Sequence, residues 1–322
     1  MSFDIRNEVV DAEKRIREYI RETPVELSPH LSQLGNCRVH LKLENNQITG
    51  SFKLRGAVNK FLSLSANERN EDVITASSGN HAAAFAHVLH KFGGKGIIYL
   101  PANASQAKVQ ALRLTGVKLK QYGDDCIKSE TLAKETAAKT GQVFISPYND
   151  PKIIGGQGTI GIELMRQIEE IDCVLVPVGG GGLISGIAGY LKAVDKNIEI
   201  IGCQPENSPV MHASIQAGRI LEMESKPSIA DGTAGGIDPD TITFDICRKF
   251  VDDFILVSED EIKAAIRFMI DKHQLLVEGA AALSVAAFIK EKQLFTSKNV
   301  VLIISGKKIS LDQLKTILIE GA

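Results

Sequence analysis

The sequence lacks an excess of either charge, and it lacks long apolar runs. Its 322 residues include 37 Lys plus Arg and 39 Asp plus Glu, so no electrostatic force favours binding to nucleic acid or another polyanion. Its longest apolar runs, such as residues 300–304, are far too short to span a bilayer, and the first twenty residues mix acidic and basic side chains. We therefore expect no nucleic-acid partner, no membrane-spanning helix and no signal peptide.

The sequence also lacks paired cysteines. Its five cysteines are scattered and none forms a C-x-x-C pair, so the sequence predicts neither a zinc site nor a redox dithiol. Reduced thiols of this kind are typical of cytoplasmic proteins. His81, His87 and His90 lie on one predicted helix, but no carboxylate or thiol joins them at ligand spacing, and no metal site is predicted there.

What the sequence does contain is an alternation of short apolar runs and helix-period stretches. The runs that predict strands begin at residues 73, 96, 117, 143, 173, 198, 254 and 299. Helical patterns cover residues 80–94, 105–116, 128–141, 259–275 and 279–292. The alternation predicts an α/β fold of two three-layer α/β/α subdomains with mostly parallel sheets.

The two subdomains are unequal in size. We expect a small, mobile domain at residues 64–149 and a large domain built from residues 1–63 plus 150–322. Ligands of open parallel sheets bind at the carboxyl ends of the strands. We therefore expect the site in the cleft between the domains, at residues that directly follow the apolar runs.

A run of four glycines follows one predicted strand and precedes a helical pattern. Gly179, Gly180, Gly181 and Gly182 can turn tightly and point several backbone N–H groups at one anion, and the following helix adds its positive N-terminal end. A phosphate-binding loop is predicted. The dinucleotide-binding pattern G-x-G-x-x-G is incomplete here, because Ser185 occupies the position of its third glycine. A small phosphate-containing ligand is therefore favoured, and NAD is only the second candidate.

A second strand end carries ASSGNHAAA, residues 76–84. Ser77, Ser78, Gly79, Asn80 and His81 place hydroxyl, amide and imidazole groups beside free backbone N–H groups at a helix start, which suits a substrate carboxylate. The alternative is an ordinary helix N-cap, for which one Ser or Asn would suffice.

The stretch TGSFKLRGA, residues 49–57, contains a lysine between two apolar residues. If Ser51 caps a helix, Lys53 lies in its first turn, where the helix dipole and burial beside Phe52 and Leu54 both lower the pKa of the amine. Such a lysine is a nucleophile for carbonyl groups and a usable base. Together with a phosphate-binding loop it predicts pyridoxal 5'-phosphate as the cofactor.

The late run at residues 302–310 reads LIISGKKIS and ends in Ser305. A hydroxyl there can hydrogen-bond a pyridine nitrogen, but it cannot hold that nitrogen protonated as a carboxylate would. Taken alone, the Ser-Gly pair is only a turn signal.

Taken together, these motifs and GGQGT at residues 155–159 resemble the fold-type II (tryptophan synthase β-like) pyridoxal-phosphate enzymes, specifically the serine/threonine dehydratase and serine racemase family. The resemblance runs from about Thr23 to Ile309. It implies a Schiff base at Lys53, the cofactor ring beside Phe52 and the substrate carboxylate on the 77–81 loop. It also implies Asn80 at the ring hydroxyl, the phosphate at Gly179, Gly180, Gly181 and Gly182, and Ser305 at the ring nitrogen. Members of this family are commonly cytoplasmic homodimers.

The activity implied by the resemblance is elimination of water from small hydroxy amino acids. L-threonine would give 2-oxobutanoate and L-serine pyruvate, each with ammonia. Ser78 adds an alternative, because serine racemases carry serine at this position whereas biosynthetic threonine dehydratases usually carry alanine. Racemisation by Lys53 and Ser78, dehydration of 3-hydroxyaspartate, and cofactor binding without turnover therefore remain alternatives.

The sequence departs from the family pattern at two places. Metal-activated racemases carry acidic residues at the positions of Gln204 and near Val210, so no metal ion is predicted here. Where relatives read Ser-Gly-Gly-Asn, this chain has Lys307 and Lys308 after Ser305 and Gly306. Positive charge near the ring edge would oppose protonation of the pyridine nitrogen if these side chains point inward.

Overall fold

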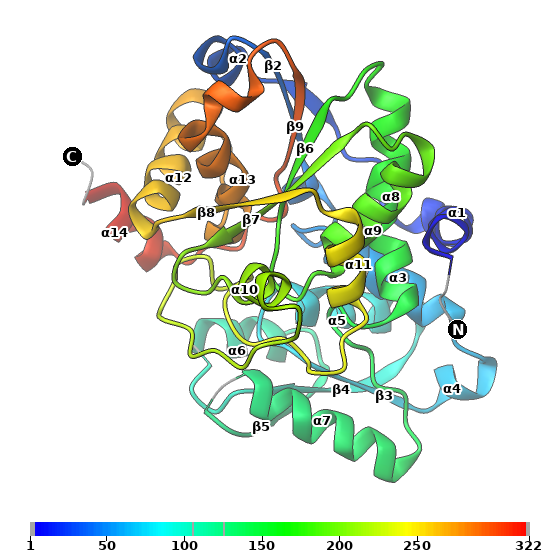
Figure 1. The fold of residues 1–322 in the computed structure, drawn as a ribbon. Coiled ribbons are helices and arrows are strands. Elements are labelled where there is room, and N and C mark those ends of the chain that lie inside the picture. Colours follow the sequence, from blue (N-terminus) through cyan, green and yellow to red (C-terminus); the bar gives the residue numbers. More distant parts are fainter. Residues whose placement is uncertain (1–3, 105, 125, 320–322) are drawn as a thin grey trace.

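The residues that the structure describes, 4–104, 106–124 and 126–319, form two sheets of different size in this computed structural model (Figure 1). The large sheet has the order β1-β2-β9-β6-β7-β8 and the small sheet the order β3-β4-β5. β1 pairs antiparallel with β2, and every other strand pair is parallel, which confirms the predicted α/β class. The strands are β1 (Val25–Leu27), β2 (Arg38–Lys42), β3 (Asp72–Ala76), β4 (Lys95–Leu100), β5 (Lys118–Gln121), β6 (Cys173–Pro177), β7 (Glu199–Pro205), β8 (Asp253–Val257) and β9 (Asn299–Ile303).

Seven of the eight predicted strands form at or near their expected positions. The expected strand at residues 143–147 is wrong as an extended element: within it, only Phe144 pairs, in an isolated bridge with Ile74. The carbonyl of Ile145 is instead occupied by the hydroxyl of Thr75, and the chain turns away toward the cavity described below. β1 and β2 were not predicted.

The helices are α1 (Ile5–Ile16), α2 (Pro29–Gly35), α3 (Lys53–Ser63), α4 (Ala66–Asn70), α5 (Asn80–Phe92), α6 (Gln106–Arg113), α7 (Cys126–Thr140), α8 (Pro151–Gln167), α9 (Gly182–Val194), α10 (Val210–Ala217), α11 (Thr243–Phe250), α12 (Glu259–His273), α13 (Gly279–Lys290) and α14 (Leu311–Ile319), with short 3-10 turns at Arg17–Tyr19, Glu44–Asn46 and Lys292–Phe295.

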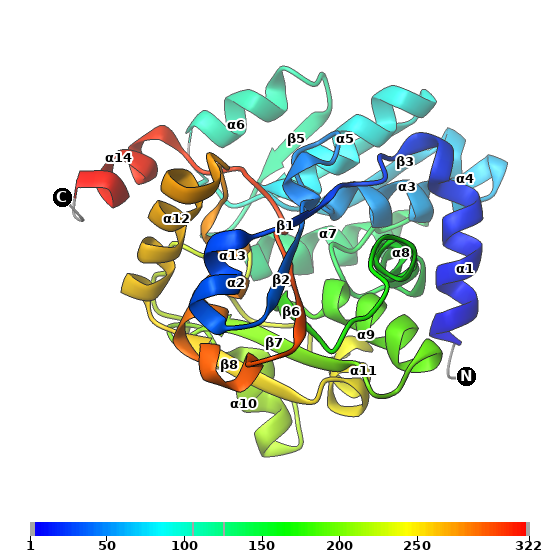
Figure 2. The same cartoon turned by 90° about the horizontal axis from the view of Figure 1, so that it is seen from above.

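Helices cover both faces of the large sheet because its central strands are apolar on both faces. In β6, Cys173 and Leu175 pack with α2, α12 and α13, whereas Val174 and Val176 pack with α8, α9, α10 and α11. This alternation follows from the two-residue period of a strand. Figure 2 shows the strands between the two groups of helices.

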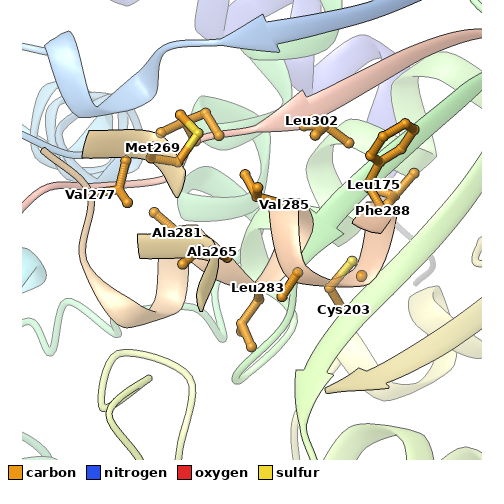
Figure 3. Close-up of a cluster of buried hydrophobic side chains, with 14 of the residues drawn as sticks. Leu175, Cys203, Ala265, Met269, Val277, Ala281, Leu283, Val285, Phe288 and Leu302 are labelled. Atoms are coloured by element: carbon orange, nitrogen blue, oxygen red, sulfur yellow. The ribbon is translucent and has the colours of Figure 1, made fainter. Parts of the chain in front are cut away.

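The larger apolar core lies between the sheet and the α12/α13 pair (Figure 3). Leu175 and Leu302 extend from β6 and β9 toward Val285 and Phe288 of α13, and Leu283 points to the other side of this helix. All five side chains are fully buried. The many alanines of α13 allow this helix to lie close to the sheet.

The small sheet has its own layers. α3, α5 and α6 pack on one face and α7 on the other. Its strands fall within the predicted small domain at residues 64–149, but the limits of the two domains stay a prediction. Residues 1 and 322, the ends of the predicted large domain, and residue 105, the start of one predicted helix, lie outside the described residues. None of the described helices is long and apolar enough to cross a membrane.

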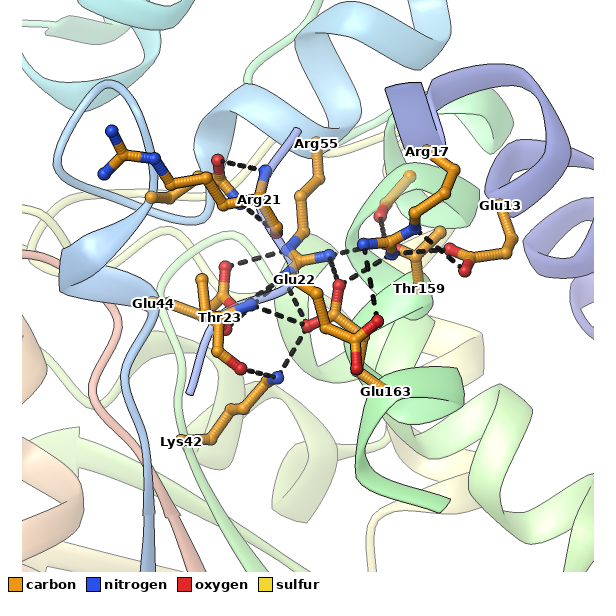
Figure 4. A network of polar contacts seen from close by, with 12 residues as sticks. Glu13, Arg17, Arg21, Glu22, Thr23, Lys42, Glu44, Arg55, Thr159 and Glu163 are labelled. Atoms are coloured by element: carbon orange, nitrogen blue, oxygen red, sulfur yellow. Dashed lines mark hydrogen bonds and ion pairs between the residues drawn. The ribbon is translucent and has the colours of Figure 1, made fainter. Parts of the chain in front are cut away.

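A buried ionic network joins the helix that carries Lys53 to the large sheet (Figure 4). Arg55 of α3 donates to Glu44 (2.7 Å) and to Glu163 of α8 (2.7 Å), and Lys42 of β2 donates to Glu163 (2.6 Å). These four side chains are completely buried, and their two positive and two negative charges balance. Burial acts to raise the pKa of Glu163, but the two cations more than offset it and lower that pKa, so Glu163 stays ionised.

Close contact between α3 and α8 also fixes the position of α3. A Cβ atom on Gly156 of α8 would lie 2.6 Å from the Cα of Gly56 in α3, so only glycine allows the two helices to approach this closely. Thr159, in the next turn of α8, accepts a hydrogen bond from Arg55 (3.1 Å). The GGQGT motif therefore sets the position of α3.

Glu163→Gln tests the network. The variant leaves Arg55 and Lys42 with one buried carboxylate between them, and we expect the free energy of unfolding to fall by roughly 3–5 kcal/mol. Urea denaturation measures this change. Arg166→Gln, at a half-exposed position of the same helix, is the control and should cost less than about 1 kcal/mol. A loss for Glu163→Gln no larger than that of the control would show that the network does not stabilise the fold.

Candidate active site

A cavity of about 600 Å³ lies at the carboxyl ends of strands from both sheets. Its lining includes Ala76 at the end of β3, Pro177 at the end of β6 and Ser305 beyond β9. Every residue that the sequence analysis placed in the site lines this cavity: Phe52, Lys53, Ser77, Ser78, Gly79, Asn80, His81, Gly179, Gly180, Gly181, Gly182 and Ser305. The structure thus brings the four motifs together, while their roles toward a ligand stay predictions.

Lys53 begins α3, as expected, but the predicted cap is wrong. The N-cap residue is Phe52, and Ser51 instead forms an antiparallel bridge with Gly306. The backbone N–H of Phe52 also donates to the carbonyl of Ser305 (3.1 Å). These two backbone contacts hold the segment that contains Lys53 beside the segment that contains Ser305, although the two segments are far apart in the sequence.

The amine of Lys53 lies inside the cavity. Its Nζ donates to the carbonyl of Pro147 (2.9 Å) and lies 5.1 Å from the centre of the Phe52 ring. Burial lowers the pKa of Lys53 to about 8, although the charges of Glu130 and Glu278 act in the opposite direction. At pH 7 about a tenth of the amine is therefore uncharged, far more than for an ordinary lysine, and this is the direction expected from the sequence.

The four glycines form the turn between β6 and α9. Gly181 has φ +83°, a left-handed conformation that favours glycine, and serves as the N-cap of α9. A Cβ atom on Gly180 would lie 2.5 Å from the ring of Tyr148, and one on Gly182 would lie 2.9 Å from the Tyr148 backbone. The loop therefore presents backbone rather than side chains to the cavity at a helix N-terminus, an arrangement that fits a phosphate group.

The SSGNH segment forms the N-terminus of α5. The N-cap residue is Gly79 and no side chain caps the helix, so the reading as an ordinary N-cap is not supported. Ser77 Oγ accepts a hydrogen bond from the N–H of Gly79 (3.2 Å) and orders the turn. The N–H groups of the first helical turn thus have no capping side chain, which fits the binding of a carboxylate.

His81 is held away from that role. Its Nε2 lies 3.0 Å from Thr75 Oγ1 and 3.3 Å from the carbonyl of Ile145. Burial, and then the charge of Lys53, lower the pKa of His81 to about 3, so the ring is neutral. Because Thr75 Oγ1 already donates to Ile145, the ring proton resides on Nε2, and the imidazole has no proton left to donate to a carboxylate. The backbone N–H of His81 remains as a donor.

Glu278, which the sequence analysis missed, lies at the Ser305 end of the cavity. Its carboxylate accepts from Asn80 Nδ2 (2.7 Å) and from the backbone N–H of Lys308 (2.9 Å). A Cβ atom on Gly306 would lie 2.5 Å from Glu278 Oε1, so glycine makes room for the acid. Burial raises the pKa of Glu278 to about 7, against the hydrogen bond from Asn80, which lowers it.

The two unusual lysines point in different directions. Lys308 lines the cavity, and its charge acts on Glu278. Lys307 instead lies along Gly50, whose added Cβ would be 3.4 Å from Lys307 Cε. Of these two lysines, only Lys308 lines the cavity, and Glu278 lies close enough to offset its charge.

Tyr148 and Glu130 also line the cavity and were not predicted. Tyr148 follows the apolar run at 143–147, so the strand-end rule applied to the other motifs could have found it. Glu130 lies in SETLAKET, a stretch typical of a solvent-exposed helix face, and carries no signal of a site.

Comparison with known proteins agrees with this geometry. The sequence model of the family described as "Pyridoxal-phosphate dependent enzyme" matches residues 16–306. The chain is 38% identical to the L-threonine ammonia-lyase of Thermotoga maritima over 314 residues, which are 98% of this chain and 78% of that protein.

Two solved structures are similar over almost the whole chain. The processed form of threonine deaminase isoform 2 from Solanum lycopersicum has a TM-score of 0.91 and 33% identity, and the match covers 98% of this chain and 93% of that one. Maize serine racemase has a TM-score of 0.90 and 32% identity, with 98% and 97% covered.

Glu278→Gln tests the buried acid by its effect on stability. Because the pKa of Glu278 is about 7 in the folded chain, above that of an unfolded glutamate, its protonation favours folding below about pH 4 and this contribution is lost as the pH rises through 7. From pH 5 to pH 8 the wild type should lose roughly 1–3 kcal/mol relative to the variant. Urea unfolding of the cofactor-free protein at several pH values measures the difference. The exposed Glu224→Gln is the control, and a pH-independent difference for Glu278→Gln would contradict the assignment.

Proposed function

The chain belongs to the family of pyridoxal-phosphate dependent enzymes, and on this basis we propose that it is an ammonia-lyase acting on L-threonine and L-serine. The products are 2-oxobutanoate from L-threonine and pyruvate from L-serine, each with ammonia. The likeness to an L-threonine ammonia-lyase and to a threonine deaminase supports this reading.

One observation carries the proposal: the amine of Lys53 lies in the cavity that the glycine loop and the α5 N-terminus also line. A lysine with a lowered pKa is suited to bind an aldehyde, and a backbone cradle at a helix N-terminus is suited to hold a phosphate. A second helix N-terminus in the same cavity is available for the carboxylate of an amino acid. These three features are what the chemistry of this substrate class requires.

The residues present fit the cofactor. Pyridoxal phosphate supplies an aldehyde for binding amines and a ring that withdraws electrons from the substrate Cα. We assign Lys53 to the aldehyde and the backbone of Gly179, Gly180, Gly181 and Gly182 to the phosphate. Phe52 would pack beside the ring, Asn80 would face the ring hydroxyl and Ser305 the ring nitrogen. Asn80 has one N–H engaged by Glu278, so its orientation is fixed before any ligand binds.

The chain's own groups then bind the substrate and move its proton. The backbone of Ser77, Ser78, Gly79 and Asn80, with the N–H of His81, would hold the α-carboxylate at the start of α5. When its amine is not bound to the aldehyde, Lys53 would be the base that removes the α-proton, and its pKa of about 8 suits this task near neutral pH. The carbonyl of Pro147 fixes the position of its Nζ.

We also propose that the protein is a cytoplasmic homodimer. The family resemblance supports both statements. The cysteines whose side chains the structure describes, Cys37, Cys173, Cys203 and Cys247, are free thiols, as is common for cytoplasmic proteins.

Lys53→Ala tests the proposed activity. The wild type should absorb near the visible range when loaded with pyridoxal phosphate and should release keto acid from L-threonine or L-serine. The variant should lose the band and at least about a hundredfold of the rate, since both the attachment point and the base are gone. Lys91→Ala, at an exposed position of α5, is the control. A wild type that shows the band without releasing ammonia would instead indicate cofactor binding without turnover.

Serine racemisation is a second candidate, favoured by Ser78 in the cavity and by the likeness to maize serine racemase. Ser78 is a hydroxyl that can exchange a proton with the substrate Cα, in addition to the amine of Lys53. The alternative role of Ser78 is only to bind the carboxylate.

Ser78→Ala separates these two roles. If Ser78 exchanges a proton, the rate of D-serine formation from L-serine should fall at least about tenfold while keto acid release falls much less. Chiral chromatography and a keto acid assay on the same samples measure both rates. Equal losses in the two rates would assign Ser78 to carboxylate binding alone.

A further inference from the structure

One wall of the cavity carries an acid that the proposed chemistry does not use. Glu130 lies in the middle of α7, lines the cavity and has a side chain only 16% exposed. α7 and α5 pack on opposite faces of the small sheet. Glu130 therefore belongs to a different wall of the cavity than the predicted carboxylate site at the start of α5. Its charge acts on Lys53 and Tyr148, two other residues that line the cavity.

The position of Glu130 is fixed by contacts between α7 and the segment at residues 231–238. Lys134, one turn later in α7, lies 3.0 Å from Glu130 Oε1 and also pairs with Asp238. Asp238 in turn accepts from Asn149 Nδ2 (3.0 Å), and its N–H donates to Tyr148 Oη (2.7 Å). On the other side, the Ile127 side chain fills the space beside Gly236. Glu130 is therefore held at a closed wall rather than on a free helix surface.

Burial raises the pKa of Glu130, although the charges of Lys134 and Lys53 act in the opposite direction and favour the ionised carboxylate. Lys108 donates to Asp231, and Lys308 lies beside Glu278. The charge of Lys134 is shared between Glu130 and Asp238. Lys134 Nζ lies 3.0 Å from Glu130 Oε1, and the carboxylate keeps further lone pairs that can accept a hydrogen bond from a ligand.

We propose that Glu130 selects the substrate by its side chain, admitting a neutral hydroxyl and rejecting a second carboxylate. The inference deepens the proposed function and rests on it for the binding of an amino acid through its amine and α-carboxylate. With those two groups held at Lys53 and at the α5 N-terminus, the side chain is the part of the substrate left to meet the remaining walls. Close to the ionised Glu130, a second carboxylate would bind at least about tenfold more weakly than a neutral group of the same shape.

This selection bears on the alternatives left open by the sequence. Serine and threonine carry a neutral hydroxyl, which can donate a hydrogen bond to Glu130. Aspartate and 3-hydroxyaspartate carry a second carboxylate, which cannot do so when ionised and is repelled. Selection of this kind by Glu130 would disfavour dehydration of 3-hydroxyaspartate.

The test compares L-aspartate with L-asparagine, which have the same shape and differ in charge. Binding to the pyridoxal-phosphate-loaded wild type and to Glu130→Gln is followed by the change in near-visible absorption. The wild type should bind asparagine at least about tenfold more tightly than aspartate, and Glu130→Gln should reduce this ratio about tenfold or more, mainly by tighter binding of aspartate. In parallel, the ratio of kcat/KM for 3-hydroxyaspartate to that for L-serine should rise by a similar factor.

Glu135→Gln is the matched control, because Glu135 lies on the same helix with a side chain 54% exposed and pairs with Lys139 outside the cavity. It should leave the asparagine/aspartate ratio unchanged. An unchanged ratio in Glu130→Gln, or equal binding of the two amino acids by the wild type, would overturn the inference. A purely structural role would lower the urea midpoint and weaken both amino acids equally, which also overturns it. If no hydroxy amino acid is turned over but the ratio shifts as stated, the proposed lyase activity fails and the selectivity of the site stands.

Discussion

The pairing of Arg55 with Glu44 and Glu163 is the interaction on which the position of the reactive lysine depends. Arg55 lies two residues after Lys53 in the same helix, and its partners come from the 3-10 turn after β2 and from α8. Because the charges are completely buried, they are tolerated only with all partners in place, which permits one arrangement of α3 against the large sheet. The close contact of Gly56 with Gly156 fixes the same arrangement through shape.

The parts of the fold that the sequence predicted well are those with strong local signals. The fully apolar strand β6, the glycines after it and the capped helix α12 can each be recognised from neighbouring residues alone. The short strand β1, with two of three residues exposed, has no such signal. The run at 143–147 shows the opposite limit: it has strand character, but it pairs only through Phe144, and side chains of Thr75 and His81 take up the carbonyl of Ile145.

The candidate site was predictable where it consists of backbone at strand ends, and unpredictable where it depends on distant side chains. The glycine loop and the α5 N-terminus follow from the rule that ligands lie beyond the carboxyl ends of parallel strands. Glu278 enters the cavity because Gly306, far along the chain, leaves space for it, and Glu130 enters because Lys134 pairs with Asp238. The orientation of His81 likewise depends on Thr75 and Ile145, which no pattern within SSGNH reveals.

The place of β9 in the large sheet has a consequence for biosynthesis. β9 lies between β2 and β6, yet it begins at residue 299, so the ribosome completes β2 and β6 long before the strand that joins them exists. Until then both strands carry unpaired edges, which are prone to pair with other chains. The small sheet pairs consecutive strands and meets no such delay. The nascent chain therefore depends on residues that are synthesised late, both for a complete sheet and for the Ser51–Gly306 bridge beside Lys53.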